Sequence, residues 1–463
     1  MTSDSLIISV SGIRGIVGQG LTPDVVARYA AAHGAERRAA TGRSTIVVGR
    51  DSRVSGPMLQ AAAMAGLQSV GCDVIDIGLA CTPTILLAIE REAAAGGIAV
   101  TASHNPAEWN ALKLASERGM FLTPDEAERV RVCVERDRIP FVAWDELGSI
   151  TVREGATRAH IKAILADPLV DTKAVWDRGF KVVVDGCAGA GGQAARPLLD
   201  ALGVTIDGLH LQATGLFPRE PEPVAANLGE LSARVRDTDA DLGFAIDPDG
   251  DRLALVDETG APVGEDMTLA LAVDYVLGEL AVDGQLPRPV VTNVSTSQIV
   301  DRAAEIHGAI VERTPVGEVN VALRMAEIES PIGGEGNGGV IYPPLHLTRD
   351  ASVAMALILS YLARTGRSLS EAVERFPEYT IHKTKVWLSG VHARRLLERA
   401  AVAFEGAEQD ETDGLKLIWP ERQEWVQLRQ SGTEPVVRVI AEAPDAMRAK
   451  ELVKQARDLA GDP

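Results

Sequence analysis

A serine followed by a histidine stands where a short apolar segment ends. The segment GGIAV (96–100) has the composition of a buried strand and leads into Thr101–Pro106 (TASHNP), whose Asn-Pro pair favours a turn. Exposed at such a strand end, Ser103 can be phosphorylated, with His104 and backbone N–H groups to position it. The hexapeptide alone is equally compatible with an Asx-type turn that carries a surface histidine. A serine-hydrolase elbow is excluded, since the pattern GxSxG is absent.

Three aspartates alternate with other residues in the segment DPDGDR (247–252). They are Asp247, Asp249 and Asp251, and apolar residues precede and follow them. In an extended loop, residues two apart point the same way, so the three carboxylates can converge on one hard cation. With a phosphate oxygen as a further ligand, this donor set suits Mg²⁺. The alternative is a solvated turn, but such charge density beside FAI and LALV would need compensation.

Two other protein classes use a similar acidic segment. An EF-hand loop requires glycine at its sixth position, where this chain has Arg252, and the following Leu253–Val256 resembles a strand rather than a helix. A dehalogenase-type phosphatase would use Asp247 as its nucleophile and Asp249 as its acid/base. Asp251 stands where such enzymes usually have Thr or Val, and the motif lies in the middle of the chain. This phosphatase is the strongest rival enzyme class.

Two further loops carry polar groups suited to a phosphorylated sugar. Gly334–Gly339 (GEGNGG) places Glu335 and Asn337 on one side, where they can hydrogen-bond paired hydroxyls, although a flexible turn explains the glycines equally well. Arg429–Pro435 (RQSGTEP) combines an arginine, two hydroxyls and a glycine that leaves backbone N–H groups free, as in an anion-binding nest. A hairpin turn with a surface arginine is its alternative.

The elements that must position these loops repeat three times along the chain. Each copy begins with a β-branched strand, continues through a polar or glycine-rich turn into a helix, and returns in a second strand. Each later has a short apolar strand that ends in one of the first three loops. The opening strands are expected at Thr45–Gly49, Lys181–Asp185 and Pro289–Val294. This alternation predicts parallel sheets with right-handed crossovers, whose ligands lie beyond the carboxyl ends of the strands. The three loops therefore converge if the copies face one another.

The rest of the chain has a different pattern, in which short connections predict an antiparallel α+β domain. The expected fold class is therefore α/β, with three similar α/β domains followed by one α+β domain. The expected domains are 1–150 with the serine loop, 151–256 with the metal loop, 257–371 with the sugar loop, and 372–463 with the phosphate loop.

The composition narrows the class of protein further. The chain has 463 residues, 46% of them hydrophobic, and a formal net charge of −19 at pH 7. Nucleic acids and anionic membranes attract clustered Lys and Arg, so this charge argues against both, although a few arginines can still bind an anionic substrate. No signal peptide or membrane-spanning run is evident, and the cysteines lack metal or redox spacing. These features predict a cytoplasmic protein with buried thiols.

Taken together, the motifs resemble those of the α-D-phosphohexomutase family, which includes phosphoglucomutase, phosphomannomutase and phosphoglucosamine mutase. The resemblance covers essentially the whole chain. Besides the four loops it includes Ser11–Gly15 (SGIRG), Gly49–Arg53 (GRDSR) and Arg313–Gly317 (RTPVG). It implies three similar α/β domains with mixed sheets and a C-terminal domain resembling the TATA-binding-protein fold, arranged around a central cleft.

The resemblance also implies roles for particular residues. Ser103 would be a phosphoserine, and Asp247, Asp249 and Asp251 would bind one Mg²⁺ together with its phosphate. The residues implied at the phosphoryl-transfer site are Arg14, His104, Lys113 as general acid/base, and Arg252. Those implied in substrate binding are Thr314 and Gly317, Glu335 and Asn337 at the sugar hydroxyls, and Arg429, Ser431, Gly432 and Thr433 at the non-reacting phosphate.

The implied activity is transfer of a phosphoryl group between the 6- and 1-positions of a hexose phosphate, through the phosphoserine and a bisphosphate intermediate. The sugar loop departs from the common family pattern GExSGH, because Asn337 replaces Ser and Gly339 replaces His. The segment TPVGE resembles the TAVGD of phosphoglucosamine mutases more than the TGH of the phosphomannomutase/phosphoglucomutase type. We therefore expect conversion of glucosamine-6-phosphate to glucosamine-1-phosphate, with glucose or mannose phosphates as the alternative. We expect a monomer or a homodimer.

Overall fold

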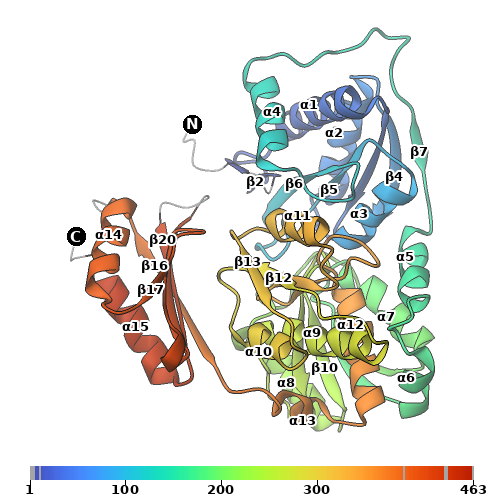
Figure 1. The fold of residues 1–463 in the computed structure, drawn as a ribbon. Coiled ribbons are helices and arrows are strands. Elements are labelled where there is room, and N and C mark those ends of the chain that lie inside the picture. The colour runs from blue at the N-terminus through green and yellow to red at the C-terminus, as the bar shows by residue number, and fades with distance from the viewer. Residues whose placement is uncertain (1–5, 10–11, 389–391, 432–435, 461–463) are drawn as a thin grey trace.

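The structure is a computed structural model that describes residues 6–9, 12–388, 392–431 and 436–460. Figure 1 shows three α/β regions that pack together and a smaller C-terminal part, coloured orange to red, that stands beside them. This arrangement confirms the expected fold class. The boundaries given above for the domains stay a prediction.

The N-terminal region is built on a seven-stranded mixed sheet. In spatial order its strands are β1 (Leu6–Ser9), β2 (Gly12–Ile16), β6 (Trp109–Ser116), β5 (Gly96–Val100), β3 (Thr45–Arg50), β4 (Asp73–Leu79) and β7 (Ile150–Val152). Its helices are α1 (Pro23–Thr41), α2 (Gly56–Gln68), α3 (Thr82–Arg91) and α4 (Pro124–Glu135). The start of α4 is a capping box, in which the side chains of Thr123 and Glu126 each accept the other residue's backbone N–H.

The second and third regions each contain a four-stranded sheet. The second has α5 (Ala156–Leu165), α6 (Thr172–Arg178), β8 (Lys181–Asp185), α7 (Gly191–Ala201), β9 (Thr205–Leu209), α8 (Gly229–Asp237), β10 (Leu242–Ile246) and β11 (Leu253–Asp257). The third has α9 (Glu265–Val282), β12 (Val290–Asn293), α10 (Ile299–Glu305), β13 (Val311–Thr314), α11 (Glu318–Ile328), β14 (Gly333–Glu335), β15 (Gly339–Ile341), α12 (Ala351–Thr365) and α13 (Leu369–Val373).

The threefold repeat predicted from the sequence is confirmed by the strand order. The three sheets share the orders β6-β5-β3-β4, β11-β10-β8-β9 and β15-β14-β12-β13. In each copy the opening strand is parallel to both neighbours, and the third strand forms an antiparallel hairpin with the fourth. The serine, acidic and sugar loops are the turns of these three equivalent hairpins. The same topology therefore delivers each loop to the same end of its own sheet.

The second and third regions share one hydrophobic core. Its buried residues run from Ile161 to Phe376 and include side chains from β8, β10, α9 and α12. Strand β10 is buried on both faces, as its continuous apolar sequence predicts. Cys72, Cys81 and Cys187 are buried thiols, but Cys133 is only partly buried, so the expectation is wrong for that residue. Cys133 lies on α4, where Val130 is the only buried residue.

The C-terminal part is an antiparallel sheet with helices on it, as expected. Its strands lie in the order β16 (Thr380–Trp387), β20 (Val436–Ala443), β19 (Glu424–Gln430), β18 (Leu415–Trp419) and β17 (Glu408–Asp410), with helices α14 (Ala393–Ala403) and α15 (Ala446–Asp458). Polar contacts join it to the turn after β12. Lys416 Nζ donates to the carbonyl oxygen of Val294 at 2.7 Å, and Ser295 Oγ donates to Gln427 Oε1 at 2.6 Å.

Candidate active site

Ser103 lies in the hairpin turn between β5 and β6, in a backbone conformation that residues other than glycine seldom adopt. Its φ is +50° and it is 3% exposed. Ser103 Oγ donates to Asp247 Oδ2 at 2.9 Å, and Nδ1 of His104 lies 3.3 Å from the same Oγ. The expectation of an exposed serine is wrong here, because the acidic loop of the second copy covers the hydroxyl.

Arg53 holds the backbone of the serine turn. The side chain is fully buried, and its guanidinium donates to the carbonyl oxygens of Ser103 and Asn105 at 2.6 and 2.7 Å and to two more carbonyls of the same hairpin. The carboxylate of Asp51 lies 3.0 Å from Arg53 Nε. Both residues belong to the GRDSR segment, but no role was predicted for them. The bonds of a buried ion pair to a turn about 50 residues away cannot be recognised from the neighbouring sequence.

Two arginines and a neutral histidine lie in or beside the serine and acidic loops. Arg14 on β2 donates to Asn105 Oδ1 at 2.8 Å, and Arg252, next to the acidic loop, has a buried Nε without a hydrogen-bond partner. The positive charge of Arg252, together with burial and the charge of Arg14, lowers the pKa of His104 well below its usual value. His104 is therefore uncharged at neutral pH, and the two guanidinium groups carry positive charge that could stabilise an anionic group there.

The three aspartates of the acidic loop converge. Their carboxylate oxygens lie within 4.8 Å of one another, and all three side chains are buried. The loop turns sharply at Gly250, whose φ is +73°, so a tight turn rather than an extended segment brings them together. Burial and the charges of Asp251 and Asp249 raise the pKa of Asp247 well above its usual value.

This donor set fits a hard divalent cation such as Mg²⁺. Oδ1 of Asp249 and Oδ1 of Asp251 are both buried without a hydrogen-bond partner. An unpaired buried carboxylate oxygen is costly, and crowded carboxylates repel one another. A cation bound to these oxygens would remove both costs, since Mg²⁺ takes oxygen ligands and commonly uses one or two carboxylates beside a phosphate.

Lys113 lies on β6 and reaches the same carboxylates. Its Nζ is 2.6 Å from Asp249 Oδ2 and 3.7 Å from Asp251 Oδ2, and the residue is 5% exposed. Burial alone would lower its pKa, but the charges of Asp249 and Asp251 outweigh burial and raise the pKa above the usual value of lysine. Lys113 is therefore protonated and can donate a proton within the site.

The sugar loop brings Glu335 and Gly317 together. Glu335 Oε1 accepts from Asn293 Nδ2 at 2.8 Å and from the backbone N–H of Gly317 at 3.3 Å. Oδ1 of Asn337 is buried and has no hydrogen-bond partner, so it is available to a ligand. The hydroxyl of Thr314 instead donates to the carbonyl of the next residue at 3.0 Å. Of the four predicted residues in this region, Glu335, Asn337 and Gly317 thus lie at or beside the loop.

Arg349 links the sugar loop to the acidic loop and was not recognised from the sequence. Its Nη2 lies 2.5 Å from Asp251 Oδ2, and its Nη1 lies 2.6 Å from Glu335 Oε2. A β-carbon on Gly339 would lie 2.2 Å from Arg349 Cδ. Glycine at position 339 therefore leaves the space that the arginine stem fills. That glycine was the one available signal in the sequence.

The predicted phosphate loop begins within β19, whose last two residues are Arg429 and Gln430. Arg429 Nη1 lies 3.7 Å from Asp413 Oδ2, and Arg429 Nε is buried without a hydrogen-bond partner. Burial lowers the pKa of Arg429. Ser431 is buried, and its backbone N–H donates across the hairpin to the start of β20 at 2.9 Å. Gly432 and Thr433 lie outside the described residues.

Comparisons with known proteins identify the family. Models of the phosphoglucomutase/phosphomannomutase alpha/beta/alpha domains I, II and III match residues 6–139, 158–260 and 264–379, and the model of the C-terminal domain matches residues 391–459. The chain is 38% identical over 446 residues to a phosphoglucomutase/phosphomannomutase of Thermococcus kodakarensis, covering 96% of both chains. It is 37% identical over 447 residues to a probable phosphoglucosamine mutase of Methanopyrus kandleri, covering 96% of this chain and 95% of the relative.

Solved structures agree with this assignment. A phosphoglucomutase/phosphomannomutase family protein of Burkholderia thailandensis has a TM-score of 0.85 at 27% identity, covering 99% of this chain and 98% of the other. A putative phosphomannomutase of Thermus thermophilus has a TM-score of 0.83 at 25% identity, covering 100% of both. The chain therefore belongs to the phosphoglucomutase/phosphomannomutase family, a family of mutases and hence of isomerases. Among the described residues, no helix is long and apolar enough to cross a membrane.

Proposed function

We propose that this chain moves a phosphoryl group between the 6- and 1-positions of a hexose phosphate, with Ser103 as the phosphate carrier. The hydrogen bond from Ser103 Oγ to Asp247 Oδ2, at 2.9 Å, carries the proposal. It joins the serine hairpin to the acidic hairpin. A phosphoryl group on Ser103 would therefore lie beside the carboxylates of the acidic loop and the positively charged side chains of the site. Such an arrangement suits a serine that accepts a phosphoryl group from one substrate oxygen and transfers it to another. Membership of the mutase family makes a phosphatase with Asp247 as nucleophile the weaker reading.

The reaction consists of two phosphoryl transfers. In the first, the bond between Ser103 Oγ and phosphorus breaks and a new O–P bond forms to the free hydroxyl of the hexose phosphate. The proton lost by that hydroxyl balances the proton gained by Ser103 Oγ, and the product is a hexose 1,6-bisphosphate. In the second transfer, the other phosphate of the bisphosphate returns to Ser103. The net result is isomerisation, without any further co-reactant.

The residues around Ser103 stabilise charge and carry the proton. Mg²⁺, held by Asp247, Asp249 and Asp251 with an oxygen of the Ser103 phosphate, would neutralise negative charge on the transferring group. The two arginines, Arg14 and Arg252, and the uncharged His104 line the same site. The supporting observation is that Arg252 Nε is buried without a hydrogen-bond partner and can donate to a phosphate oxygen.

Lys113 is the proposed proton carrier of the two transfers. Its buried ammonium lies 2.6 Å from Asp249 Oδ2, within the same cluster of residues as the Ser103 hydroxyl. A protonated amine at this place can give its proton to Ser103 Oγ as the O–P bond breaks. The neutral amine can then take the proton of the sugar hydroxyl, so that each transfer leaves Lys113 as it began.

The remaining predicted residues would bind the substrate. Glu335 and Asn337 are proposed to accept and donate hydrogen bonds at the sugar hydroxyls, beside Gly317 and Thr314, with Arg349 holding the Glu335 carboxylate. The proposed holders of the non-reacting phosphate are Arg429, Ser431, Gly432 and Thr433. Because each phosphate must occupy this loop in turn, the bisphosphate has to turn round between the two transfers.

The preferred sugar is proposed to be glucosamine-6-phosphate. The support is the TPVGE segment beside Glu335, together with the name of the Methanopyrus kandleri relative. The relative from Thermococcus kodakarensis carries the broader name phosphoglucomutase/phosphomannomutase, which makes glucose and mannose phosphates the alternative. The cytoplasmic location and the monomeric or dimeric state stay predictions.

A coupled assay with Mg²⁺ on glucosamine-, glucose- and mannose-6-phosphate tests the proposal. We expect kcat/KM to be highest for the glucosamine compound, and Ser103→Ala to be inactive on all three. Equal kcat/KM values on the three sugars would rule out the sugar preference and leave the mutase in place. Release of inorganic phosphate without any 1-phosphate product would rule out the mutase itself.

A further inference from the structure

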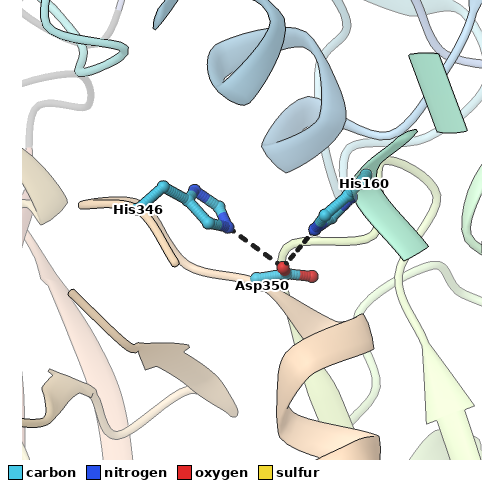
Figure 2. Close-up of side chains that lie close together, drawn as sticks. All are labelled: His160, His346 and Asp350. Atoms are coloured by element: carbon cyan, nitrogen blue, oxygen red, sulfur yellow. Dashed lines mark hydrogen bonds and ion pairs between the residues drawn. The ribbon is translucent and has the colours of Figure 1, made fainter. Parts of the chain in front are cut away.

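Two buried histidines share one carboxylate oxygen close to the acidic loop (Figure 2). His160 Nε2 lies 2.8 Å and His346 Nε2 lies 3.0 Å from Oδ2 of Asp350, and none of the three residues is more than 3% exposed. The other oxygen of Asp350 accepts the backbone N–H of Ser352 at 2.8 Å and so caps helix α12. The reaction described above gives no role to this cluster.

The separations in the cluster are those of hydrogen bonds rather than of ligands around a cation. A tetrahedral site with bonds near 2.0 Å would hold its ligand atoms about 3.3 Å apart. Burial opposes ionisation of Asp350, but the charge and hydrogen bond of His160 outweigh it and lower the pKa of the carboxyl. Both imidazoles therefore donate from Nε2 to a carboxylate. Thr84 Oγ1 lies 2.9 Å from Nδ1 of His160, so the same ring also hydrogen-bonds to Thr84.

His160 lies where three regions of the molecule meet. It belongs to α5, which packs against α3, α7 and α12. Thr84 is in the first turn of α3, and Asp350 is the N-cap residue of α12. One imidazole ring therefore ties the start of α3 to the start of α12.

The same two helix starts hold the acidic loop. In the first turn of α3, Thr82 donates its backbone N–H to the carbonyl oxygen of Asp249 at 2.8 Å and its hydroxyl to Asp249 Oδ2 at 2.7 Å. At the start of α12, the N–H of Ala351 donates to the carbonyl oxygen of Gly250 at 3.1 Å. The loop is bonded to both helices, and His160 bonds the helices to each other. The contacts form a closed, buried ring that includes Asp249 and Gly250.

We propose that His160 is a positioning residue for the acidic loop. By tying Thr84 to Asp350 it fixes the two helix starts that hold Asp249 and Gly250, and so sets the geometry in which the loop binds a divalent cation. The inference rests on the proposed function, since it takes the acidic loop as the metal site. Loss of a residue bonded directly to a metal ligand typically weakens metal binding by about 10- to 100-fold, and His160 acts one step further away, through Thr84 and Asp350. The lower end is expected here, because the direct contacts of Thr82 and Ala351 remain.

The test is Mn²⁺ binding to the full chain without sugar, measured by electron paramagnetic resonance and calorimetry. His160→Ala is expected to raise the dissociation constant about tenfold. Thr84→Val removes the hydroxyl at nearly constant volume and should raise it by a smaller factor. The double variant should bind no more weakly than His160→Ala, because both changes interrupt the same chain of contacts. At saturating Mg²⁺, the KM of each variant for the hexose phosphate should equal that of the wild type.

His307 provides a matched control. Its Nε2 lies 2.8 Å from Asp274 Oδ1, and that carboxylate is bonded to Tyr361 and Arg375 rather than to the acidic loop. His307→Ala should lower the melting temperature and leave Mn²⁺ affinity unchanged.

The possible outcomes separate the inference from the proposed function. If Thr84→Val and His160→Ala both bind Mn²⁺ as tightly as the wild type, the positioning role is wrong. If the wild type does not bind Mn²⁺, or if Asp249→Asn binds it equally well, the proposed metal site is wrong instead.

Discussion

Ser103 Oγ lies 2.9 Å from Asp247 Oδ2, although 144 positions separate the two residues in the chain. The contact arises because both residues stand in the turn of the same hairpin in two copies of one repeat. Parallel strands deliver their loops to one end of the sheet, and two such ends face each other here. A nucleophilic hydroxyl and a cluster of carboxylates are thereby brought together without any local sequence link between them.

Removal of divalent metal should abolish mutase activity. Oδ1 of Asp249 and Oδ1 of Asp251 are buried without a hydrogen-bond partner, and without a cation the phosphoryl group would meet the negative charge of the acidic loop. Dialysis against a chelator is expected to lower kcat at least ~10³-fold, and added Mg²⁺ to restore it. The kcat of Asp249→Asn should rise little when Mg²⁺ is added. Full activity of the chelated wild type would contradict the metal role.

Asn337→Ala should impair substrate binding without loss of stability. Oδ1 of Asn337 is buried and unpaired, so its removal eliminates an unsatisfied group rather than a hydrogen bond. We expect an unfolding free energy within about 0.5 kcal/mol of the wild type and a clearly raised KM for the hexose phosphate. The contrasting variant is Asn293→Ala, which loses the bond to Glu335 and should be destabilised by about 1–3 kcal/mol. An unchanged KM in Asn337→Ala would remove this residue from the sugar site.

Arg349→Met should destabilise the protein by about 3–5 kcal/mol, because it removes the guanidinium that bridges the buried carboxylates of Asp251 and Glu335. Chemical denaturation with and without Mg²⁺ is the measurement. Mg²⁺ should recover part of the loss, since a bound cation would neutralise Asp251. The control is Arg288→Met, at a half-exposed ion pair, where the change should stay below about 1 kcal/mol. Equal unfolding free energies of the two variants would show that the contacts of Arg349 with Asp251 and Glu335 do not stabilise the fold.

His33 should make stability depend on pH in mildly acidic solution. Burial lowers its pKa from 6.5 to about 4, and the positive charge of Arg37 acts in the same direction. The unfolded chain binds a proton at this residue below pH 6.5, whereas the folded chain does not until about pH 4. Its contribution is therefore fully present above pH 6.5 and is lost as the pH falls toward 4, by about 3 kcal/mol in total. Denaturation of His33→Gln between these pH values should show a shallower slope, and an identical slope would contradict the assignment.

The regular elements of the repeat could be predicted because their signals are local. Strand β8 was expected at Lys181–Asp185 and lies there, since a run of valines bounded by glycines specifies a buried strand. The loops with chemical function were recognisable for a similar reason, because serine, carboxylates and glycines cluster where strands end. The convergence of the three carboxylates was also expected, although the sharp turn at Gly250 brings it about rather than an extended loop.

Features that depend on distant contacts were not predicted. Arg53 and Arg349 each contact a turn far away in the chain, and neither contact can be recognised from the neighbouring residues in the sequence. The positive φ of Ser103 was not expected either, because nothing in TASHNP requires it. Burial of Ser103 likewise depends on a loop from another copy of the repeat. The same holds for His160, whose contacts come from α3 and from the start of α12.

The central claim is that the phosphoryl group on Ser103 is passed to the sugar, and rapid-quench transfer of a radioactive label tests it most directly. Enzyme labelled with ³²P is mixed with unlabelled glucosamine-6-phosphate and Mg²⁺, and samples are quenched within the first turnovers. We predict that the label leaves Ser103 at a rate no slower than kcat and appears first in the bisphosphate and then in the monophosphates. Label that stays on the protein, or that is released only as inorganic phosphate, would contradict the account.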